Sequence, residues 1–274
     1  MNRPLLLLMA LQMSVSISAQ SKAGFRKLNP GEAAFLTKVY YIMAGAVPHT
    51  FYDWKTDNEE DDFDALKLWS TGPGNAGEHR GDCPISLGKT EPYAVSYTII
   101  FMMPDKQSKA VLLAAYKKIT DYNSPSQISG ALKSTAVCRL TIDITTNVMP
   151  SAITKMSYCG KTPPARILLP VPAKLALLGR RTDNCPIMAG GKIDMTADYY
   201  DTALIFLGKP VVKKPVPQQM PGLVQTGYSA GFDRSQIGHM TIQNMIISIH
   251  GDAADINVAI RMIDWKKLYY LVDK

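Results

Sequence analysis

Residues 226–232 read TGYSAGF and contain Gly-x-Ser-x-Gly centred on Ser229. In many esterases and lipases this pattern marks the turn that presents a nucleophilic serine, and an acid and then a histidine follow it along the chain. Asp233, His239 and His250 follow Ser229 in that order. These four residues are therefore the candidate catalytic set of a serine hydrolase.

The elements expected around Ser229 do not fit that chemistry. A nucleophile elbow needs a strand, a strained turn and a helix in immediate succession. Here LVQT is the one strand candidate before the serine, and the following GFDRSQIGH has no helical periodicity. Only 45 residues follow Ser229, too few to complete a hydrolase sheet. We therefore predict a glycine-rich loop with no catalytic residue, and retain the hydrolase as the alternative.

Metal and cofactor chemistry has little support in the sequence. The histidines occupy positions 49, 79, 239 and 250, and no two have the i, i+4 spacing of a helical zinc site. The acidic run at 57–69 lacks the pattern of a calcium-binding loop and fits the first turns of a helix, where negative charge is favourable. The sequence predicts no metal and no cofactor.

The first 19 residues are typical of a secretory signal peptide. A positively charged start, MNRP, precedes a short apolar stretch and a small-residue run that ends at Ala19. No later apolar run reaches the length of about 20 residues that spans a bilayer. We therefore expect cleavage near Ala19 and a periplasmic or extracellular protein with no transmembrane segment after the signal is removed.

Four cysteines, an even number, predict two disulfides in an exported chain. The run CRLTIDITTNVMPSAITKMSYC reads as two strands of one hairpin, which favours Cys138 with Cys159. Cys83 and Cys185 then pair by elimination. The other two connectivities stay open, as does a set of four free thiols in a reducing compartment.

The positive charge of the chain is spread rather than concentrated. There are 30 Lys and Arg residues against 23 Asp and Glu residues, a formal net charge of +7, but the basic residues occur as scattered pairs. Nucleic-acid recognition usually places basic residues in a stripe with aromatic side chains. We therefore expect no nucleic-acid partner, and instead an unidentified protein or other envelope component.

Apolar periodicity and capping residues predict an α+β fold, with a predominantly antiparallel sheet and helices packed at the N- and C-terminal ends. A capping box predicts that Asn29 begins the first helix, and Asp252 is expected to cap the last, over 252–271. The expected strands lie at 93–103, 138–159, 202–206 and 240–249, with a helix at 106–119 and an extended loop or edge segment at 209–222.

The glycine-rich and proline-rich stretch 70–92 is the clearest boundary. With the signal peptide over 1–19, this boundary predicts a helical lead-in over 20–80 and a main α+β domain over 81–274. The strand-then-helix pattern at 95–119 recurs in outline at 242–268, which indicates a weak internal duplication.

These observations favour an exported binding or interaction module of the cell envelope that uses loops such as 70–92 and 209–232. Two alternatives remain. One is the Ser229 hydrolase, and the other is a structural envelope protein that self-associates through the aromatic residues Trp265, Tyr269 and Tyr270 of its last helix. The sequence does not fix the oligomeric state.

Overall fold

The structure is a computed structural model, and it describes thirteen separate stretches of the chain. They are residues 29–57, 95–124, 127–128, 131, 136–147, 154–159, 163–180, 188–189, 192–193, 200–209, 211–215, 223–230 and 240–272. The predicted signal peptide, the acidic run beyond residue 57, the boundary loop 70–92, Cys83 and Cys185 lie outside these residues.

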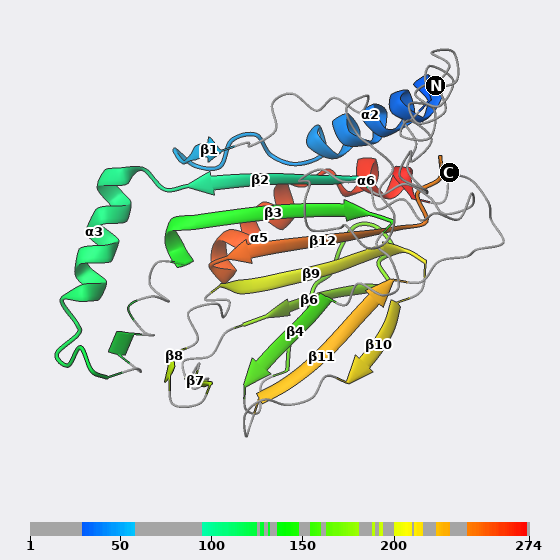
Figure 1. The fold of residues 1–274 in the computed structure, drawn as a ribbon. Helices are drawn as coiled ribbons and strands as arrows, with labels where there is room; N and C mark the ends of the chain where they lie inside the picture. The colour runs from blue at the N-terminus through cyan, green and yellow to red at the C-terminus, as the bar shows by residue number, and fades with distance from the viewer. Residues whose placement is uncertain are drawn as a thin grey trace, which may run out of the picture.

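A seven-stranded antiparallel sheet forms the centre of the fold, with the strand order β1-β2-β3-β12-β9-β6-β5 (Figure 1). Its strands are β1 (Lys55–Asp57), β2 (Ser96–Met102), β3 (Arg139–Thr146), β5 (Ala165–Arg166), β6 (Leu175–Gly179), β9 (Asp201–Gly208) and β12 (Asn244–Gly251). The predicted α+β fold with an antiparallel sheet is confirmed.

Alternating side chains give this sheet two different faces. On β3, Leu140, Ile142 and Ile144 are fully buried, while Thr141 and Asp143 between them are only partly buried. The buried set faces the helices α2 (Pro30–Ala44), α5 (Ala253–Met262) and α6 (Trp265–Leu271), and the helices and the sheet form one hydrophobic core. Full burial of each such side chain contributes about 1.5–3 kcal/mol.

The first helix begins where the sequence predicted. The Asn29 side chain accepts a hydrogen bond from the Glu32 N–H (2.9 Å), and a Glu32 carboxylate oxygen accepts one from the Asn29 N–H (2.9 Å). This capping box satisfies two N–H groups that otherwise have no helical partner. Ala33, Leu36 and other residues of α2 pack against the sheet, so the described part of the predicted lead-in shares the core of the main domain.

The predicted single helix over 252–271 is two helices. Asp252 caps α5 as predicted, by accepting a hydrogen bond from the Ala254 N–H (2.8 Å). The backbone becomes extended at Ile263, and Asp264 then caps α6 by accepting from the Lys267 N–H (3.1 Å). This break allows Ile263 and Trp265, 4% and 3% exposed, both to enter the core.

A three-stranded antiparallel sheet, in the order β10-β11-β4, lies against part of the second face of the central sheet (Figure 1). Its strands are β4 (Thr154–Cys159), β10 (Val211–Pro215) and β11 (Leu223–Ala230), and β7 (Met188–Ala189) with β8 (Lys192–Ile193) forms a separate two-stranded sheet. Tyr228 of β11 packs on Leu204, Phe206 and Ile246 of the central sheet. The sequence predicted either an extended loop or an edge segment at 209–222, and β10 within it is an edge strand.

The predicted hairpin of residues 138–159 is wrong. β3 pairs with β2 and β12, whereas β4 pairs with β11 in the other sheet. Cys138, which follows Ala136 and Val137 in a short 3-10 helix before β3, is a free thiol. The structure therefore does not form the predicted bond between Cys138 and Cys159, because β4, which ends at Cys159, belongs to the three-stranded sheet and does not pair with β3.

Helix α3 (Asp105–Tyr116) confirms the predicted helix after β2, but it stands beyond the end of the sheet (Figure 1). Helix α5, which follows β12, instead packs on the sheet face. The two strand-helix units thus resemble each other only in order along the chain, and an internal duplication is not shown. Among the described residues, no helix is long and apolar enough to cross a membrane.

Candidate functional site

Ser229 lies inside strand β11 rather than at a turn between a strand and a helix. Its backbone is paired with Val212 of β10, and the preceding Gly227 is paired with both Lys155 and Lys214. The predicted loop is therefore wrong over residues 226–230, because Tyr228 gains a buried position on the central sheet when this segment is a strand. Asp233 and His239 lie outside the described residues.

His250 lies on β12, in the partly buried polar half of the second sheet face. Its Nδ1 atom is 3.1 Å from the Thr202 hydroxyl, and its Nε2 atom is 3.9 Å from a carboxylate oxygen of Asp143. The other Asp143 oxygen accepts a hydrogen bond from the Thr98 hydroxyl at 2.7 Å. A line of polar side chains thus crosses four neighbouring strands, β2, β3, β12 and β9.

This polar line suits hydrogen bonding to a ligand better than covalent chemistry. The distance between His250 and Asp143 exceeds that of a hydrogen bond, so the carboxylate attracts the imidazole only when the ring is protonated. Side chains on one face of a sheet project side by side. A nucleophile, a base and oxyanion donors must instead converge on one reacting atom.

Sequence reasoning singled out His250 but missed its neighbours. Asp143, Thr98 and Thr202 come from three other strands, and only the strand register brings them together. The alternation in RLTIDITT, with a polar residue at every second position, was the available signal, because it marks a strand whose second face is polar.

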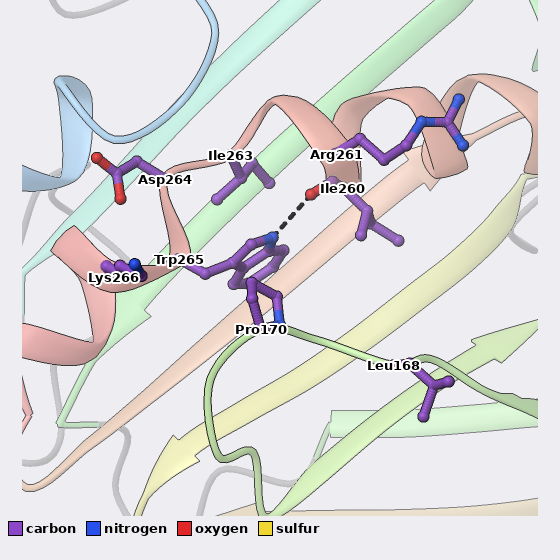
Figure 2. A pocket seen from close by; sticks show the side chains of 8 residues that line it. All are labelled: Leu168, Pro170, Ile260, Arg261, Ile263, Asp264, Trp265 and Lys266. Atoms are coloured by element: carbon purple, nitrogen blue, oxygen red, sulfur yellow. Dashed lines mark hydrogen bonds between the residues drawn. The ribbon is translucent and has the colours of Figure 1, made fainter.

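A groove lies on the helix-covered side of the central sheet, between α5–α6 and the extended segment 168–170 (Figure 2). Its volume is about 380 Å³. Apolar side chains line the groove, and three charged residues accompany them: Leu168, Pro170, Ile260, Ile263 and Trp265, with Arg261, Asp264 and Lys266. Trp265 is fixed in position, since its indole N–H donates to the Ile260 carbonyl oxygen at 2.7 Å.

The segment that forms one wall explains the unusual exposure of Leu168. Residues 167–174, ILLPVPAK, alternate strictly between partly buried and exposed positions. Ile167, Leu169 and Val171 pack against the core, which directs Leu168 and Pro170 outward. Leu168 is consequently 87% exposed, the highest value among the exposed large hydrophobic side chains that the structure describes.

Charge around the groove is unbalanced in favour of cations. The Asp264 carboxylate already accepts a hydrogen bond from the Lys267 N–H as the cap of α6. Among the described residues, neither Arg261 nor Lys266 has an acidic partner, and both are exposed. The groove thus offers an apolar surface lined by two cations and by one carboxylate that already serves as a helix cap.

The sequence did not reveal this groove. Its two walls are formed by residues about ninety positions apart, which no local pattern connects. The alternation in 167–174 nevertheless marks Leu168 as an apolar residue in an outward-facing set that otherwise holds Pro170, Pro172 and Lys174. Trp265, one of the three aromatic residues named for self-association, is buried, whereas Tyr270 is 66% exposed.

No cluster of three or more potential metal-binding side chains occurs within the described stretches of the chain. Comparison of the sequence with protein-family models and curated proteins, and of the fold with solved structures, found no match.

Proposed function

We propose that the protein is an exported binding module of the cell envelope, and that its groove between α5–α6 and residues 168–170 takes up an apolar group that carries a negative charge. The observation that carries this proposal is the 87% exposure of Leu168 beside an apolar hollow lined also by Arg261 and Lys266, two cations that have no acidic partner among the described residues.

The apolar part of such a ligand would supply most of the binding free energy. Burial of a leucine side chain removes apolar surface from water and contributes about 1.5–3 kcal/mol. A volume of about 380 Å³ falls in the range of small-ligand sites. The fixed Trp265 ring and the prolines limit rearrangement, so little conformational entropy is lost when a ligand enters.

The negative charge of the ligand would come to lie near Arg261 or Lys266, whose side chains project on either side of Trp265 (Figure 2). A carboxylate, sulfonate or phosphate accepts charge-assisted hydrogen bonds from these side chains, which are stronger than bonds between neutral groups. A cationic ligand would be repelled by the same side chains. We therefore expect the groove to prefer apolar anions to apolar cations of the same size.

The first test uses 8-anilinonaphthalene-1-sulfonate, an apolar aromatic anion whose fluorescence rises in apolar surroundings. We expect saturable binding by the native chain, and at least about a tenfold loss of affinity in Leu168→Asp, which removes apolar surface and repels the anion. Leu113→Asp is the matched control, because Leu113 is also exposed, at 60%, but lies on α3. Equal affinity of the two variants would refute the groove as the binding site.

Export is tested separately from ligand binding. Cell fractionation and the intact mass of the isolated protein determine where it resides and where it begins. We expect a protein outside the cytoplasm whose mass corresponds to cleavage near Ala19. Retention of the full chain in the cytoplasm would remove the envelope from the proposal and would leave the groove experiment unaffected.

A further inference from the structure

Helix α3 differs from the other long helices because it projects beyond the end of the central sheet (Figure 1). Of its twelve residues only Ala115 is buried, whereas α2 and α5 bury continuous apolar faces in the core. Its position is fixed near its start, where the Gln107 side-chain amide donates to Asp53 at 3.0 Å. The Met103 N–H, just before the helix, donates to the Cys138 carbonyl oxygen at 2.9 Å.

One exposed stripe runs along α3 and continues one residue past its end. We call it the lysine stripe, and it consists of Lys106, Lys109, Leu113, Tyr116 and Lys117. Steps of three and four residues place side chains on the same side of a helix. Leu113 is 60% exposed and Tyr116 is 47% exposed, so the stripe presents two large apolar groups between cations.

The charge of the stripe is not neutralised within the described parts of the chain. Lys106, Lys109 and Lys117 have no acidic partner there, and Asp105 at the start of α3 is the one carboxylate of the helix. Gln107, which contacts Asp53, lies about 100° around the helix from its neighbour Lys106, so that contact leaves the lysines turned outward. A complementary partner must be anionic and must also accept exposed apolar groups.

We propose that the lysine stripe docks the protein on an anionic phospholipid surface. Lysine side chains can contact phosphate groups while Leu113 reaches toward the acyl chains and Tyr116 lies at the headgroup level, where tyrosine is enriched. A single projecting helix is convex and therefore fits a plane better than a shaped pocket. An acidic protein segment or another soluble polyanion would use the three lysines but would leave Leu113 without an apolar partner.

The attraction should be moderate and additive. Each lysine near an anionic membrane surface contributes about a fivefold gain in partitioning at physiological ionic strength, and the gain decreases as salt screens the charges. The stripe carries three lysines, so their removal should lower partitioning by well over tenfold. This binding is peripheral and independent of the groove proposed above.

The test is sedimentation of the full chain with vesicles of phosphatidylcholine containing about one third phosphatidylglycerol, compared with vesicles of phosphatidylcholine alone. The variant Lys106→Gln/Lys109→Gln/Lys117→Gln removes the stripe charge. Its matched control is Lys38→Gln/Lys55→Gln/Lys174→Gln, which removes three exposed lysines outside the stripe and leaves the same net charge. All variants share the same N-terminal residues, so differences among them report on α3.

We expect preference for the anionic vesicles, a loss of more than tenfold in the stripe variant, and less than about a twofold change in the control. Leu113→Asp should also lose binding, whereas Leu168→Asp should retain it. Far-ultraviolet circular dichroism verifies that each variant is folded. Equal binding of the stripe variant and its control, or no preference for anionic vesicles, overturns the proposal. Stripe-dependent binding of polyglutamate without vesicle binding also overturns it, in favour of an acidic macromolecule.

Discussion

The side-chain oxygen of Asn147 accepts a hydrogen bond at 2.8 Å from the backbone N–H of Gln243, a residue 96 positions further along the chain. The Asn147 amide group also donates to the Thr241 carbonyl oxygen at 2.8 Å, and its backbone N–H donates to the Asn244 carbonyl oxygen at 2.8 Å. These bonds join the end of β3 to the start of β12. They fix the register that brings Asp143 toward His250.

Substitution of Asn147 by alanine should lower the free energy of unfolding by about 3 kcal/mol. Asn147 is 1% exposed, so its loss leaves the buried Gln243 N–H and the partly buried Thr241 carbonyl group without their side-chain partner, at about 1–3 kcal/mol for each group. Its φ of 49° lies in the left-handed region, which asparagine tolerates better than alanine. Urea unfolding followed by tryptophan fluorescence measures the change.

Asn147→Gly is the informative control for this prediction, because it removes the same two side-chain hydrogen bonds but tolerates the positive φ at this position. It should cost less than Asn147→Ala. A loss below about 1 kcal/mol in the alanine variant would show that water replaces the side chain and that the hydrogen bonds of Asn147 contribute little to stability.

The contrast between Asn147 and Asn29 shows which parts of this fold can be predicted from sequence. Asn29 and Glu32 are three residues apart, and their capping box follows from residue types alone. Strand pairing joins segments that are far apart, so the local pattern gives the strands but not their neighbours. The predicted hairpin of residues 138–159 was wrong for this reason, because β3 pairs with β2 and β12 and not with β4, the strand that follows it.

The same reasoning applies to the candidate sites. His250 was a candidate because of its residue type. Asp143 is one of several alternating polar residues of β3, and only the strand register shows that it lies near His250. The groove has an even weaker local signal, because Ile260 and Trp265 look like ordinary core residues and one wall comes from residues 168–170. By contrast, the lysine stripe is local, and a helical projection of 105–117 would have revealed it.

Cys138 should react slowly with thiol reagents in the native protein. Partial burial raises the pKa of its thiol above the usual value, so less of the reactive thiolate is present at neutral pH. Without reductant, we expect labelling by iodoacetamide to be several-fold slower in buffer than in urea, and to accelerate as the pH rises above 9. Mass spectrometry of peptides locates the label.

The Cys138 experiment also tests the free thiol that the structure shows. A Cys138→Ser variant should take up one label fewer than the native sequence after denaturation without reductant. If the variant instead takes up one label more, because replacing Cys138 releases the thiol of a partner cysteine, then Cys138 is in a disulfide in the native protein, and the pairing predicted from the sequence must be considered again.

Asp255 should make the protein less stable as the pH rises above about 4. Burial raises the pKa of its carboxyl group most, and the nearby Asp252 raises it further, while a hydrogen bond from the Tyr52 hydroxyl lowers it. The folded state therefore holds the proton to higher pH than the unfolded state, whose reference pKa is 3.8. The contribution of the protonated Asp255 to stability is therefore present in full below pH 3.8 and is lost as the pH rises through the pKa of the folded state.

Asp255→Asn isolates this effect, because it keeps the shape of the side chain and removes its charge. The variant should gain stability relative to the native protein as the pH increases from 4 to neutrality, by less than about 1 kcal/mol, since the carboxyl group remains partly solvated. Tyr52→Phe removes the bond that lowers the pKa and should steepen the pH dependence of the protein that retains Asp255. Urea unfolding at several pH values gives the difference, and a constant difference or one of opposite sign would contradict the raised pKa.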